Sequence, residues 1–87
     1  MFKVKLKIGE LYSLNLLDVN NEAEIIDMSF YDCITHKRFM DLGLTRGINL
    51  KIKKKSPIGG LISFEIRDYE LALRESDLKK IIVRLKK

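Results

Sequence analysis

The chain contains no tryptophan, one cysteine, one proline and one histidine among its 87 residues. A single cysteine, Cys33, cannot form an internal disulfide, so the fold does not depend on an oxidising compartment. Without tryptophan or a row of aromatic residues, an aromatic groove for proline-rich peptides is poorly supported. The single histidine, His36, has no candidate serine or second acid at a recognisable spacing, so the sequence argues against an enzyme.

Long apolar segments are also absent. No stretch approaches the ~18 apolar residues that a membrane span requires, and the first residues, MFKVKLKI, alternate charged and apolar side chains, unlike a signal peptide. These absences predict a cytoplasmic protein without direct membrane insertion. Hydrophobic residues make up 46% of the chain and charged residues 33%, which favours one globular domain over residues 1–87.

The positive charge is unevenly distributed. The net charge is +5, from 17 basic and 12 acidic residues. Residues 1–45 hold 5 basic and 7 acidic side chains, a net of −2, whereas residues 46–87 hold 12 and 5, a net of +7. A basic half favours an acidic partner, which could be nucleic acid, an anionic surface or an acidic protein face.

Alternation of apolar and polar residues predicts short strands along most of the chain. The expected strands cover residues 2–8, 23–28, 48–53, 62–66, 69–73 and 81–85. Between the first two, residues 11–19 show no clean period and end at the turn pair Asn20-Asn21. One short helical turn is expected from Ser76 to Lys80. This pattern predicts a mainly β fold of five to six short strands that form a small, strongly bent sheet or barrel.

A change of period between Ser29 and Gly43 predicts one inserted α-helix of about ten residues. Asp32 can cap its first turn, and Gly43 can adopt the left-handed conformation that closes it. The residues expected to face inward are Ile34, Phe39 and Leu42, and those expected to face outward are Lys37, Arg38 and Asp41.

The segment Arg38 to Gly47, RFMDLGLTRG, precedes the alternating run INLKIKK, and further along the chain come Pro57-Ile58-Gly59, Leu71-Ala72-Leu73, Asp77 and Ile81-Ile82-Val83. In this order and spacing, the chain resembles the FeoA family, small cytoplasmic proteins of bacterial ferrous-iron uptake. The resemblance covers about residues 12–85, and residues 1–11 look like an N-terminal extension.

This resemblance implies an SH3-like β-barrel and an accessory role beside FeoB, a membrane transporter with a cytoplasmic GTPase domain. The same barrel occurs at the end of iron-responsive repressors of the diphtheria-toxin-repressor type. Those repressors carry a separate DNA-binding region, for which 87 residues leave no room. Gly43 and Gly47, with Leu42 and Leu44 beside them, are expected to define the fold as a helix stop and a turn. No Gly-Lys-Ser/Thr accompanies them, which argues against a phosphate loop.

A metal site on the helix is the alternative to a structural or surface role for Cys33 and His36. Transition-metal binding would suit an iron-uptake protein. Cys33 and His36 stand three residues apart, and Asp32 lies beside them. A stable zinc or ferrous-iron site needs three or four protein ligands, and no second cysteine or histidine exists. We therefore predict neither a metal site nor a cofactor, and a ferrous-iron titration would test Cys33 and His36.

The lysine cluster before Pro57 is the expected contact surface. It comprises Lys51, Lys53, Lys54 and Lys55, followed by the loop residues Pro57, Ile58 and Gly59. Three interpretations remain open: a solvated strand face that blocks aggregation, a protein-binding surface shared with Lys37 and Arg38, and a nucleic-acid site on residues 51–60. The leading hypothesis is binding to the FeoB cytoplasmic domain, and an exposed strand edge would also permit homo-oligomers.

Overall fold

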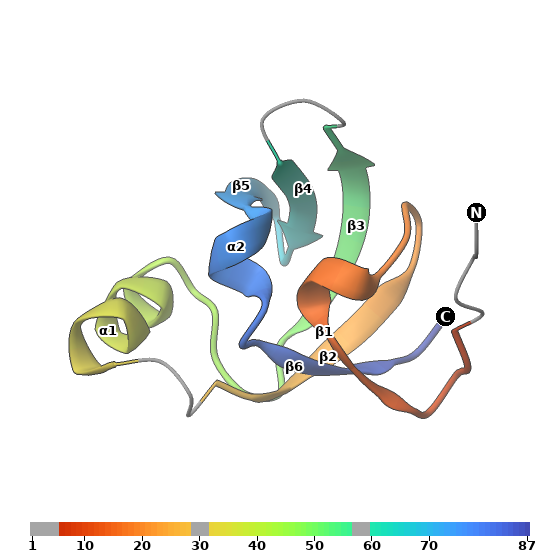
Figure 1. Cartoon of the computed structure of the whole chain (residues 1–87), viewed down its shortest axis with the longest axis horizontal. Helices are drawn as coiled ribbons and strands as arrows, with labels where there is room; N and C mark the ends of the chain where they lie inside the picture. The colour runs from red at the N-terminus through yellow and green to blue at the C-terminus, as the bar shows by residue number, and fades with distance from the viewer. Residues whose placement is uncertain (1–5, 29–31, 57–59) are drawn as a thin grey trace.

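The computed structural model describes residues 6–28, 32–56 and 60–87. In chain order the elements are β1 (Leu11–Ser13), the 3-10 helix η1 (Leu14–Leu16), β2 (Glu22–Asp27), α1 (Cys33–Asp41), β3 (Asn49–Lys55), β4 (Leu61–Ile66), β5 (Tyr69–Arg74), α2 (Glu75–Leu78) and β6 (Ile82–Leu85). The predicted mainly β architecture with an α-helix inserted after an early strand is confirmed (Figure 1).

All six strands belong to one antiparallel sheet in the order β1-β6-β2-β3-β4-β5. The C-terminal strand β6 therefore lies between the two earliest strands, which joins the beginning and end of the chain. Register shifts occur in β2 between Ile25 and Asp27, and in β3 between Ile52 and Lys54. Such irregularities increase the local twist and bend of a sheet, as a small barrel requires.

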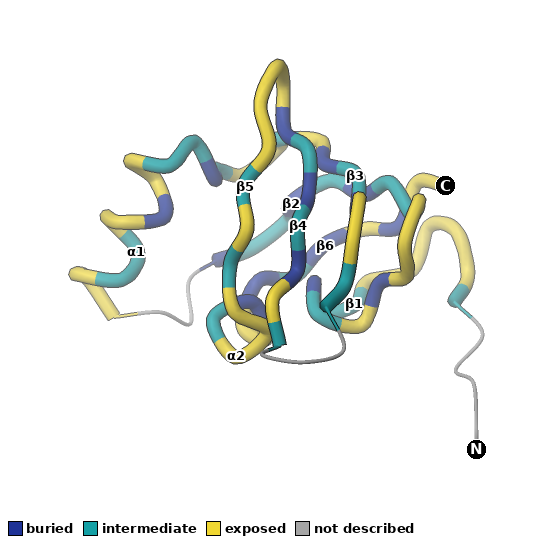
Figure 2. Tube along the Cα trace, turned by 90° about the horizontal axis from the view of Figure 1, so that it is seen from above, coloured by how far each residue is buried: buried dark blue, intermediate teal, exposed yellow. Residues whose placement is uncertain are grey.

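The core is built from the alternating apolar positions of the strands (Figure 2). On β4, and on β3 as far as Ile52, the alternation holds as predicted, because every second residue is buried there. The buried side chains of these two strands are Leu50, Ile52, Ile62, Phe64 and Ile66. The aperiodic segment after β1 also reaches the core, since Leu14 begins η1, Leu17 caps its end and both are fully buried.

The predicted strand over residues 2–8 is wrong in its described part. Residues 1–5 lie outside the described chain, whereas Ile8 and Gly9 form a turn and Ile8 is 71% exposed. Gly9, with φ of +91°, redirects the backbone, and its amide donates a hydrogen bond to the carbonyl of Leu85 (2.8 Å). Strand pairing with β6 begins at Leu11–Ser13, which form β1.

Candidate functional site

Helix α1 begins at a cap formed by Asp32, as predicted. The backbone amide of Thr35 donates a hydrogen bond to Oδ1 of Asp32 (2.8 Å). This bond, with a second from the Thr35 side chain, holds the pKa of the Asp32 carboxyl below its ordinary value of 3.8. The carboxylate thus satisfies one of the amides left unpaired in the first turn of a helix.

Only the C-terminal half of α1 packs against the barrel. Phe39 is fully buried and Leu42 is half-buried against the core, but Ile34 is 82% exposed. The prediction that Ile34 shares their inner face is wrong because five residues separate Ile34 from Phe39, about 140° around a helix with 3.6 residues per turn. Helix α1 consequently stands to one side of the barrel (Figure 1).

The corner after α1 closes the helix in a Schellman arrangement. The amide of Gly43 donates to the carbonyl of Met40 and that of Leu44 donates to Phe39, both at 3.0 Å. Gly43 has φ of +95°, a conformation that glycine adopts without steric cost. Leu44 and Phe39 are both fully buried, so their packing accompanies the backbone bonds.

Gly47 makes the second turn, at φ of +85°, and returns the chain to the sheet. Its amide donates to the carbonyl of Ile25 (2.8 Å), and the amide of Ile25 donates to the carbonyl of Ile48 (2.9 Å). The stretch from Leu42 to Gly47 is therefore a structural corner that connects the helix to β2 and β3.

The lysine cluster divides into two parts. Lys53 and Lys54 are exposed on β3, and Lys53 lies 3.8 Å from a carboxylate oxygen of Glu65. Lys55 is half-buried, and its Nζ donates hydrogen bonds to two backbone carbonyls beside η1, those of Leu17 (2.8 Å) and Asn15 (3.3 Å). The ammonium of Lys55 therefore stabilises the fold, whereas those of Lys53 and Lys54 face solvent.

Of the other predicted contact residues, the structure describes Lys37 and Arg38, which lie apart from this cluster. Pro57, Ile58 and Gly59 lie outside the described residues. Lys37 and Arg38 are exposed on α1, which lies away from the end of the β3–β4 hairpin in both views (Figures 1 and 2). The structure thus presents two separate basic surfaces.

Carboxylates interrupt the basic charge on the outer face of the sheet. Glu22 pairs across the strands with Lys51, and Glu24 pairs with Arg84. Lys86 also lies 3.2 Å from Glu24. Because the signs alternate over β6, β2 and β3, the excess charge of the C-terminal half does not form a continuous basic face there.

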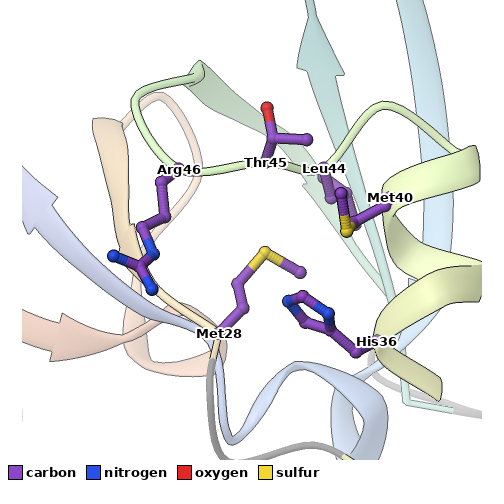
Figure 3. Close-up of a pocket in the computed structure, with 6 residues that line it drawn as sticks. All are labelled: Met28, His36, Met40, Leu44, Thr45 and Arg46. Atoms are coloured by element: carbon purple, nitrogen blue, oxygen red, sulfur yellow. The ribbon is translucent and has the colours of Figure 1, made fainter. Parts of the chain in front are cut away.

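The two candidate metal ligands of α1 point to different surroundings. Cys33 is exposed, whereas His36 is half-buried and lines a cavity of about 290 Å³ with Met28, Met40, Leu44, Thr45 and Arg46 (Figure 3). In the described part of the chain, no three His, Cys, Asp or Glu side chains are grouped to hold a metal. Sequence reasoning missed the two methionines, and the four-residue spacing of His36 and Met40 was the available signal.

Within residues 6–28, 32–56 and 60–87, no helix has the length and apolar character needed to cross a membrane.

Comparisons with known proteins agree with this architecture. The sequence profile of the FeoA domain matches residues 12–85. Among solved structures, the chain is similar to a FeoA-like protein from Clostridium acetobutylicum, with 28% identity, 90% of each chain covered and a TM-score of 0.78. It is also similar to a FeoA protein from Chlorobium tepidum, with 29% identity over 84% of this chain and 69% of that one, and a TM-score of 0.75. The comparison with curated proteins gives no match.

A manganese-dependent transcriptional repressor shares the fold alone. Its identity is 16% and its TM-score 0.80, with 93% of this chain and 45% of the repressor covered. The predicted SH3-like barrel is confirmed by these relatives. Because the profile spans nearly the whole sequence, this chain belongs to the FeoA domain family.

Proposed function

We propose that this protein is a non-catalytic, cytoplasmic accessory protein of bacterial ferrous-iron uptake, which binds and modulates the cytoplasmic GTPase domain of a FeoB-type transporter. The observation that carries the proposal is the FeoA-domain match over residues 12–85. Because this match covers most of the chain, we place the contact on the surface of the FeoA domain, including α1.

Two basic surfaces are candidates for this contact. The first is the exposed part of the β3 lysine cluster, Lys53 and Lys54, next to the loop Pro57, Ile58 and Gly59 of the sequence. The second is the face of α1 that carries Lys37 and Arg38. Charged residues at the rim of an interface mainly set the association rate and partner choice, so both surfaces call for an acidic counterpart on the transporter.

Charge reversal separates the two surfaces in a binding assay. We expect the purified protein to bind the isolated cytoplasmic domain of the FeoB-type transporter from the same organism. The variant K53E/K54E should weaken binding by about tenfold or more, mainly through slower association. The matched control is K79E/K87E, because it changes the net charge equally at two other exposed lysines. The variant K37E/R38E tests the helix surface in the same way.

The outcomes test the proposed partner and the proposed contact surface separately. Absence of binding by the unaltered protein would contradict the partner. Equal losses in all three variants would contradict a localised surface and indicate general charge attraction. In cells, deletion of the gene should reduce ferrous-iron uptake, and unchanged uptake would contradict the accessory role.

A nucleic-acid-binding barrel that uses residues 51–60 is the second candidate, favoured by the +7 charge of residues 46–87. It ranks lower because Lys55 already donates to backbone carbonyls and because carboxylates interrupt the sheet face. This candidate predicts retardation of RNA or DNA at low salt that falls steeply as salt rises. A gel-shift titration without retardation would remove it.

A further inference from the structure

The cavity beside α1 brings together three side chains that can donate electron pairs to a soft metal ion. His36 and Met40 lie on α1, and Met28 is the residue that follows β2. In Figure 3 the Met28 side chain and the His36 ring extend into the same space, with the sulfur of Met40 across from them. Two thioethers and one imidazole therefore line one opening.

Two of these donors are placed by the local structure of α1. His36 and Met40 are four residues apart, which puts their side chains on one face of the helix. Phe39 is buried against the barrel, and His36 and Met40 line the cavity together with Met28, the residue after β2. The backbone hydrogen bonds from Gly43 to Met40 and from Leu44 to Phe39 then hold the end of the helix in place.

The third donor belongs to the barrel. Met28 is 2% exposed and packs in the core while also lining the cavity, whereas Met40 is 49% exposed. One donor is thus anchored and another can move at the mouth of the cavity. A flexible thioether can adjust to a ligand without disturbing the core.

We propose that this cavity is a binding site for Cu(I), with Sδ of Met28, Sδ of Met40 and a ring nitrogen of His36 as the three ligands. Thioethers are soft ligands that select Cu(I), and imidazole also suits copper. The described residues that line the cavity include no Asp, Glu or Cys. Ferrous iron and zinc therefore lack the anionic ligands that usually hold them.

The charge of the cavity agrees better with a monovalent than with a divalent ion. Arg46 also lines the opening, and Figure 3 places its guanidinium on the opposite side of Met28 from His36 and Met40. The three proposed ligands are neutral, so a bound Cu(I) keeps a single positive charge. Its repulsion from Arg46 is half that of a divalent ion at the same distance.

Cys33 is the competing ligand that the experiment must separate. Its exposed thiol lies three residues before His36 on α1 but does not line the cavity. A thiolate also binds Cu(I) strongly, so a cysteine-centred site would give the same stoichiometry. The variant C33S removes this alternative and leaves the cavity unchanged.

The test is an anaerobic competition titration of the full chain with Cu(I) and a chromophoric Cu(I) chelator. We expect one equivalent of Cu(I) to be retained by the protein and by C33S. The variants M40L and H36Q should each weaken retention by about tenfold or more, as loss of a group that supports a metal site does. Circular dichroism of each variant checks that the fold is intact, and parallel titrations with ferrous iron and zinc should show no dependence on Met40.

Methyl NMR supplies a second readout that does not rely on the chelator. The chain has three methionines, Met1, Met28 and Met40. The methyl resonances of Met28 and Met40 should shift together and saturate at one equivalent of Cu(I), while that of Met1 serves as the internal control. Three results would overturn the site: no retained Cu(I), binding lost in C33S but unchanged in M40L, or equal shifts of all three methyl resonances.

Discussion

The hydroxyl of Tyr69 donates a hydrogen bond to the carbonyl oxygen of Leu42 (2.5 Å) and so joins the start of β5 to the end of α1. Leu42 is the C-terminal cap of the helix, and Gly43 follows it. A Cβ atom at Gly43 would overlap the same hydroxyl. Position 43 thus favours glycine for two independent reasons, the positive φ of the backbone and the closeness of the Tyr69 hydroxyl.

Comparing the stability of G43A with that of G47A should separate the cost of the backbone angle from the cost of the contact with Tyr69. Gly47 has φ of +85° and open space around a Cβ, so G47A should cost about 1–2 kcal/mol for the backbone conformation alone. G43A bears the same cost at φ of +95° and also meets Tyr69, so its loss should exceed that of G47A by about 1 kcal/mol or more. Urea unfolding measures both, and equal losses would contradict the steric contribution of Tyr69.

The hydroxyl of Tyr69 can be tested by a double-mutant cycle with Gly43. Alone, Y69F removes one hydrogen bond and should cost about 0.5–1.5 kcal/mol. In the G43A background the same change removes the overlap, so the loss should shrink or reverse, with a coupling of about 0.5 kcal/mol or more. Additive free energies of unfolding would show that alanine at position 43 is accommodated by movement of the corner instead.

Two apolar residues of α1 should differ sharply when truncated. Phe39 is fully buried, so F39A should lose about 3–5 kcal/mol through the cavity that it leaves. Ile34 is 82% exposed, and I34A should change the free energy of unfolding by no more than about 0.5 kcal/mol. Thermal unfolding of both variants measures this difference. A large loss in I34A would indicate that α1 packs on its other face.

The strands with an unbroken period of two could be predicted from the sequence, because one buried face of a sheet requires that period. Leu50 and Ile52 on β3 and Phe64 on β4 are examples. The charge–apolar alternation before Gly9 gave a wrong strand because alternation shows which side chains could share a face but not whether a neighbouring strand is available. Pairing along β6 begins only at Leu11.

The candidate site was less predictable than the fold, since it depends on contacts between distant residues. Lys55 looks identical in sequence to Lys53 and Lys54, but the register shift after Ile52 and the nearby η1 carbonyls set it apart. Met28 and His36 line one cavity only because the fold brings α1 close to the residue that follows β2. No local pattern carries that information.

Replacing single lysines on β3 by methionine should distinguish the structural role of Lys55 from the solvent-exposed position of Lys53. Nζ of Lys55 makes two hydrogen bonds to carbonyls in a half-buried position, so K55M should cost about 1–3 kcal/mol. Lys53 makes one long, exposed ion pair, so K53M should change stability by no more than about 0.5 kcal/mol. Equal effects in urea unfolding would contradict the structural role of Lys55. K55M should also increase hydrogen exchange at the amide of Leu17, which donates within η1.

The cap of α1 should make part of its stability depend on pH. The pKa of Asp32 is lowered from 3.8 in the folded state, so its ionised form stabilises the helix fully above that value. The contribution is lost as the pH falls through the lowered pKa, because protonation weakens the hydrogen bond from the Thr35 amide. Carboxyl NMR should therefore give Asp32 a titration midpoint below 3.8, and the Thr35 amide resonance should follow the same curve.

The variant D32N is the matched control, since its side-chain oxygen can still accept the bond but does not titrate. Below the midpoint of Asp32, hydrogen exchange in the first turn of α1 should rise in the unaltered protein relative to its value above pH 4. In D32N the corresponding change in protection should be absent once the intrinsic exchange rates are corrected. A midpoint at or above 3.8, or the same pH response in D32N, would show that ionised Asp32 does not stabilise the helix start.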